Sequence, residues 1–137
     1  MSRVAAYLVD ALFILLFATL GRMSHAEGLT WGGVLGVAWP FLVACAVGWV
    51  VAWRVRDWPV RMPGAPVMWL VTVVLGLALR VATGGGFAWS FGLVTLVVLG
   101  FFLVGWRCAA EVVRFGANGL TRWSERNARE NARPRSR

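Results

Sequence analysis

Four long runs of apolar residues dominate the chain, and polar residues gather between the runs and at the ends. The runs cover residues 4–20, 33–53, 66–82 and 87–106. Each approaches the roughly 20 residues that a helix needs to cross a bilayer. Apolar and polar residues do not alternate as they would in membrane strands, and only helices or closed barrels satisfy the backbone in lipid. The pattern predicts an all-α integral membrane bundle of four transmembrane helices.

Composition supports this prediction. Apolar residues make up 59% of the 137 residues and charged residues 15%, whereas a typical soluble domain has about 25% charged residues. The sequence Thr83-Gly84-Gly85-Gly86 is just long enough to turn the chain between two antiparallel helices. We therefore expect the third and fourth spans to pack as a hairpin within one domain, residues 1–107.

The arginines predict the orientation, because cytoplasmic loops of membrane proteins are enriched in basic residues. With a cytoplasmic N-terminus only Arg22 and Arg80 lie outside, and the other 12 of the 14 arginines lie inside. Both termini are therefore expected in the cytoplasm. The absence of lysine beside abundant alanine, glycine and valine is typical of a GC-rich genome, which suggests a multi-pass protein of a bacterial cytoplasmic membrane.

The first run also has features of a cleavable signal peptide: Arg3 gives a basic start, and Ser24-His25-Ala26 reads as a cleavage site. However, the run is longer than the usual apolar core of roughly 7–15 residues, and it contains Asp10. We expect it to be retained as the first span.

Asp10 is the main candidate for an intramembrane site, because ionisable residues inside spans are usually functional. It lies six residues into its run and Thr72 six residues into the third, so both are expected about 9 Å from the same boundary. Asp10 is therefore predicted to face the bundle interior and to meet the polar face of the third span, where the hydroxyl of Thr72, or that of Tyr7, can satisfy its carboxyl group. The alternative is a purely structural role, in which Asp10 pairs with Arg107 or reaches the inner surface. The candidate intramembrane polar site comprises Asp10, Tyr7, Thr72, Trp69 and Arg107.

Small residues indicate where helices pack closely. In the third run, Trp69, Thr72, Gly76 and Arg80 share a face about 80° wide. In the second run, small residues and a proline fall within about 120° of arc, which lets a neighbouring helix approach. The predicted packing residues are Gly33, Gly36, Pro40, Gly48 and Gly76.

A second polar group is predicted on the outer surface, where Arg22, His25 and Glu27 of the first loop meet Arg80. Outward arginines run against the positive-inside trend and need a reason. Either Glu27 pairs with one of them, or the group binds an anion or a lipid headgroup.

The segment 108–137 is predicted to be an arginine-rich cytoplasmic tail, in part an interfacial helix and disordered at its end. It keeps an intermittent apolar spacing, which favours anionic lipids as its partner over nucleic acid. The small-residue stripe leaves self-association or a protein partner open.

Enzyme chemistry has little support. The chain has one His and two Cys, Cys45 and Cys108, near opposite depths. A single His excludes a bis-histidine haem within one copy, and the His and Cys positions do not have the spacing of a metal site. We find no catalytic triad or paired carboxylates and expect no cofactor.

Several short motifs together suggest a family. They are Asp10, Gly21-Arg22 with His25, Trp39-Pro40-Phe41, Trp69 with Thr72 and Gly76, Leu79-Arg80, and Gly105-Trp106-Arg107. Over about Tyr7 to Arg107 the chain resembles a bacterial membrane family catalogued as a domain of unknown function. The resemblance implies a four-helix topology and no particular activity.

Two functional hypotheses follow. The first is a small transporter or channel component that uses the intramembrane acid. The alternative is an accessory or scaffold protein that binds a partner or anionic lipid. An enzyme acting on lipids is a third hypothesis, which rests only on Arg22, His25 and Arg80.

Overall fold

The computed structural model describes residues 2–23, 30–56 and 64–131, and the structural statements below concern these residues. The chain forms four helices: α1 (Arg3–Met23), α2 (Trp31–Arg56), α3 (Ala65–Ala82) and α4 (Trp89–Asn131). All four are long and apolar enough to cross a membrane. The predicted all-α architecture of four candidate spans is confirmed.

The helix ends have local causes. Ser2 caps α1, since its hydroxyl oxygen accepts a hydrogen bond from the amide of Ala5 at 3.1 Å. Pro66 lies in the first turn of α3, where its missing amide hydrogen costs nothing. After α3 the chain turns through Gly84 and Gly86, whose φ angles of 84° and 67° are strained for any residue with a side chain. This turn leads directly into α4.

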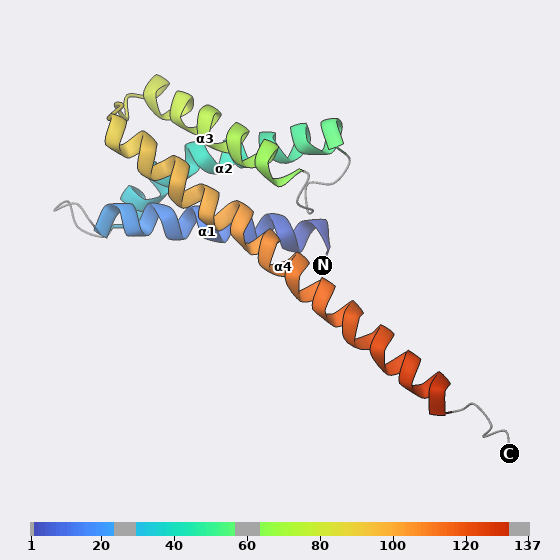
Figure 1. Ribbon diagram of the computed structural model, residues 1–137. Coiled ribbons are helices and arrows are strands. Elements are labelled where there is room, and N and C mark those ends of the chain that lie inside the picture. The colour runs from blue at the N-terminus through green and yellow to red at the C-terminus, as the bar shows by residue number, and fades with distance from the viewer. Residues whose placement is uncertain (1, 24–29, 57–63, 132–137) are drawn as a thin grey trace, which may run out of the picture.

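The helices pack as a closed ring in which α1 contacts α2 and α4, and α3 contacts α2 and α4. The α3–α4 contact agrees with the expected hairpin. α4 crosses the other helices obliquely and continues past the bundle as one unbroken helix (Figure 1). The start of α1 lies at the end of the bundle from which this extension leaves (Figure 1).

Apolar side chains fill the centre of the ring and also cover its outside. The core includes Ile14, Phe41, Met68 and Leu99. Exposed side chains such as Leu12 and Phe101 form an apolar outer surface that a bilayer would cover. Beyond Arg107 the character of α4 changes, because nearly every side chain of its extension is exposed.

Candidate functional site

Asp10 projects from α1 into the bundle interior. The buried stripe of α1 runs Ala6, Asp10, Ile14 and Ala18, at intervals of four residues. These intervals put all four on one face of the helix. The side chain of Asp10 is 0% exposed. A carboxylate at this depth is costly unless charged or polar donors surround it.

Arg107 of α4 supplies the opposite charge through a bidentate salt bridge. Its Nη1 donates to Oδ1 of Asp10 and its Nη2 to Oδ2, both at 2.8 Å. Such parallel bonds combine charge with fixed geometry and are among the strongest that side chains make. Nη1 also donates to the Leu103 carbonyl at 2.7 Å, and Nη2 lies 3.5 Å from Sδ of Met68. The guanidinium is thus held by α1, α3 and its own helix.

Two tryptophans complete the surroundings of the carboxylate. Nε1 of Trp49, on α2, donates to Oδ2 at 2.8 Å, and Nε1 of Trp106 donates to Oδ1 at 2.9 Å. The Trp106 ring centroid also lies 4.4 Å from the Arg107 guanidinium carbon, within cation–π range. We call Asp10, Trp49, Trp106 and Arg107 the polar cluster.

The chemistry open to the polar cluster is limited by how completely it is satisfied. A carboxylate offers about four acceptor positions, and Asp10 accepts four hydrogen bonds. With no exposed surface and each oxygen bonded twice, the carboxylate joins α1 to α2 and α4. Among the described residues, no group of three His, Cys, Asp or Glu side chains could hold a metal ion.

The other residues predicted for this site make different contacts. The Thr72 hydroxyl donates to the Met68 carbonyl at 2.7 Å, one turn back in α3. Nε1 of Trp69 donates to the Leu96 carbonyl at 3.1 Å. Tyr7 packs edge-on against Trp49, with ring centroids 5.9 Å apart. The structure therefore brings Asp10 and Arg107 together, with Tyr7 beside them, and leaves Thr72 and Trp69 on backbone acceptors.

Trp49, Trp106 and Met68 are the members of this environment that the sequence reasoning missed. In the sequence, Trp106 stands out only as part of the motif Gly105-Trp106-Arg107, which assigns it no partner. One signal was available, because a tryptophan placed inside a bundle needs an acceptor for its indole N–H.

Two residues predicted for the outer polar group, Arg22 and Arg80, each lie against a neighbouring helix. The Arg22 guanidinium covers Gly33 at the start of α2, where a Cβ would overlap it. Arg80 lies over the Phe91 ring, with its guanidinium carbon 4.5 Å from the centroid. His25 and Glu27 lie outside the described residues.

Small residues contribute to packing unequally. A Cβ on Gly76 would overlap the Phe41 ring, and one on Gly48 would lie 2.9 Å from the Met68 carbonyl oxygen, so α2 and α3 approach closely at both positions. Pro40 is buried within α2. Gly36 is exposed, and a Cβ added there would meet no atom within 4 Å, so the structure does not bring it against another helix.

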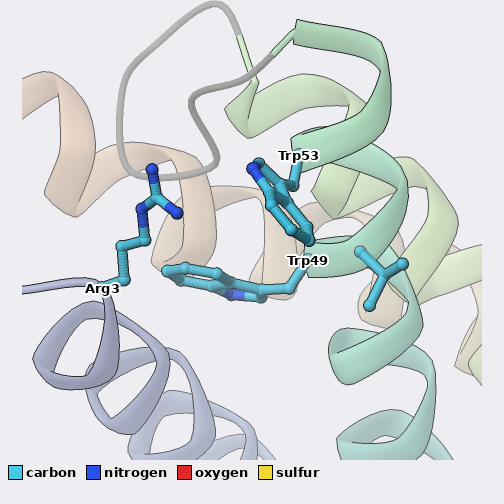
Figure 2. Close-up of a pocket in the computed structure, with 4 residues that line it drawn as sticks. Arg3, Trp49 and Trp53 are labelled. Atoms are coloured by element: carbon cyan, nitrogen blue, oxygen red, sulfur yellow. The ribbon is translucent and has the colours of Figure 1, made fainter.

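A surface pocket of about 180 Å³ lies beside the polar cluster. Figure 2 shows Arg3, from the start of α1, facing Trp49 and Trp53 of α2 across it. Val50 completes the lining. Trp49 thus has two roles: its N–H donates to Asp10, and its ring forms a wall of the pocket.

Comparison with known proteins identifies a family. The family described as "Protein of unknown function (DUF3054)" matches residues 7–110. This confirms the resemblance predicted from the sequence, and the match includes all four members of the polar cluster. No curated protein and no solved structure matches the chain.

Proposed function

We propose that this chain, which belongs to the DUF3054 family, is a membrane scaffold that presents the extension of α4 as its binding element. One observation carries the proposal: the Asp10 carboxylate is fully buried and already accepts four hydrogen bonds. An acid used in this way stabilises the bundle. Its acceptor positions are all occupied by side chains of the bundle, which leaves none for a transported solute.

The proposed orientation has both termini in the cytoplasm of a bacterium. It is supported by the 12 arginines that this orientation places inside, against two outside. A reporter active only in the periplasm and fused after Arg137 should be inactive. Activity of that fusion, together with inactivity of a fusion at Thr30, would reverse the orientation.

The extension of α4 supports the binding role. Val112, Val113, Leu120 and Trp123 are 64–72% exposed and fall within about 100° of arc on the helix. Arg114 and Arg122 lie on the opposite side. A helix with one apolar face and one basic face binds anionic membrane surfaces, and each arginine near such a surface contributes roughly 1 kcal/mol to binding.

Affinity purification of the full chain from native membranes tests the scaffold role. We expect a stoichiometric protein partner, or anionic lipid that is lost when the chain is truncated after Phe115. Purified chain in liposomes should leave the proton permeability of the liposomes unchanged. Proton flux through the purified chain that falls in the Asp10→Asn variant would contradict the proposal.

A transporter or channel component is the second candidate. The pocket beside Trp49 favours it, because the indole that lines this pocket also donates to Asp10. Four helices provide little room for a pathway, so this function requires self-association. A strictly monomeric chain in lipid would exclude it.

A further inference from the structure

The pocket between α1 and α2 combines an apolar lining with one positively charged side chain. Trp49, Val50 and Trp53 give it a largely apolar lining, and Arg3 places a positive charge at its rim (Figure 2). Trp53 is 48% exposed and Val50 is 55% exposed. These side chains belong to the end of α2 that follows its long apolar segment, a level at which tryptophans favour the membrane interface.

Arg3 brings a positive charge to this pocket. No hydrogen bond or ion pair joins its side chain to another residue in the described part of the chain. The neighbouring walls are aromatic and aliphatic and offer the guanidinium no carboxylate. An anion whose remaining part is apolar would match both the rim and the walls.

We propose that this pocket binds the phosphodiester of a membrane phospholipid. Arg3 holds the phosphate through charge-assisted hydrogen bonds, for which the guanidinium geometry is well matched. The glycerol and the first carbons of the acyl chains lie against Trp53, Val50 and the Trp49 ring. The occupant is a bilayer lipid rather than free phosphate, because the walls are apolar and the pocket opens at the end of a membrane span.

The bound lipid would also act on the polar cluster. The Trp49 ring is fixed on one side by its hydrogen bond to Asp10 and by the edge of Tyr7. A lipid in the pocket packs against the other side of the Trp49 ring, so the indole N–H stays oriented toward the Asp10 carboxylate. This site is independent of the proposed scaffold role, since it uses none of the residues of the α4 extension.

Native mass spectrometry of the full chain titrated with phosphatidylglycerol tests the proposal. Arg3→Gln should weaken the tightest lipid-binding event about tenfold. Arg54→Gln is the matched control, because it removes the same charge next to Trp53 but outside the pocket lining, and it should leave this event unchanged. If both variants lost the same lipid affinity, the effect would come from general surface charge, and the proposal would be wrong.

Two further measurements keep the test decisive. Val50→Trp fills the pocket without changing charge, so it should abolish the same binding event, whereas full retention would contradict the site. Inorganic phosphate in excess should fail to displace the lipid; displacement would identify the site as one for free phosphate. Arg122→Gln probes the α4 extension separately, so failure of the scaffold proposal is distinguishable from failure of this one.

Discussion

Two clusters of side chains join the same three helices by different chemistry. In the polar cluster, Asp10 of α1 accepts hydrogen bonds from Trp49 of α2 and from Trp106 and Arg107 of α4. About two turns further along α1, Phe17 contacts Phe41 of α2 and Phe91 of α4, with ring centroids 5.7 Å and 6.3 Å away. We call these three rings the aromatic cluster.

The difference lies in how each cluster tolerates the loss of one member. Aromatic contacts are shared among many atoms and have weak directionality, so truncating one ring leaves the others favourably packed. A buried ion pair depends on both partners, because an unpaired charge in an apolar interior is very costly. The polar cluster should therefore fail as a unit, and the aromatic cluster should weaken gradually.

The largest expected effect is that of Arg107→Leu. It leaves the Asp10 carboxylate buried beside two indoles without its charge partner, so the free energy of unfolding should fall by about 3–5 kcal/mol. Unfolding in mixed detergent micelles provides the measurement. Adding Asp10→Leu should restore much of the loss, whereas a double variant no more stable than Arg107→Leu would show that the charges are not coupled.

The next largest effect should come from removing one indole donor. Trp106→Phe keeps an aromatic ring but leaves Oδ1 with a single hydrogen bond, which should cost about 1.5–3 kcal/mol. Trp39→Phe is a suitable control, because Trp39 is 41% exposed and is not part of the polar cluster. If both variants unfold at the same denaturant concentration, the Trp106 N–H contributes nothing to stability.

Overpacking beside the aromatic cluster should cost somewhat less. In Gly76→Ala the new methyl group would overlap the Phe41 ring, and the resulting shift should destabilise the bundle by about 1–3 kcal/mol. Gly36→Ala, which meets no neighbour within 4 Å, should be neutral or slightly stabilising because alanine favours helix. Combining Gly76→Ala with Phe41→Leu should relieve part of the strain.

The smallest effect is expected for the arginine that covers the aromatic cluster. Arg80→Leu removes a cation–π contact with Phe91 at a partly exposed site, which should cost about 0.5–1 kcal/mol. A double-mutant cycle with Phe91→Leu would isolate the pair. If the coupling free energy of Arg80 and Phe91 exceeded that of Asp10 and Arg107, the polar cluster would not be the one that depends more on a single pair.

The sequence predicted the helices well because membrane spans leave strong, local signals. Apolar runs indicated all four candidate spans, and the glycines after Thr83 indicated the turn into α4. The continuity of α4 past Arg107 was not predicted. In physical terms it is unsurprising, since no proline lies between Trp106 and Asn131 and the penalties of Gly116 and Gly119 are only about 1 kcal/mol each.

The site was less predictable, because side-chain partners depend on tertiary packing. Depth and helical spacing indicated that Asp10 has neighbours on other helices, and Arg107 was recognised as one alternative. Thr72 was expected to reach Asp10, yet its hydroxyl donates within its own helix, as threonine in a helix often does. The two indole donors were missed because spacing along a helix does not determine where a ring nitrogen points.

The separation of Asp10 and Arg107 along the chain has a consequence for synthesis. They are 97 positions apart, and at about 5–20 residues per second the ribosome adds that length in roughly 5–20 s. During this interval α1 has an acidic residue but lacks the base that neutralises it, and insertion of such a helix costs about 2.5–3.5 kcal/mol for the aspartate alone. A chain that ends before residue 107 can still place Trp49 against Asp10, but its carboxylate has no charge partner until α4 is made.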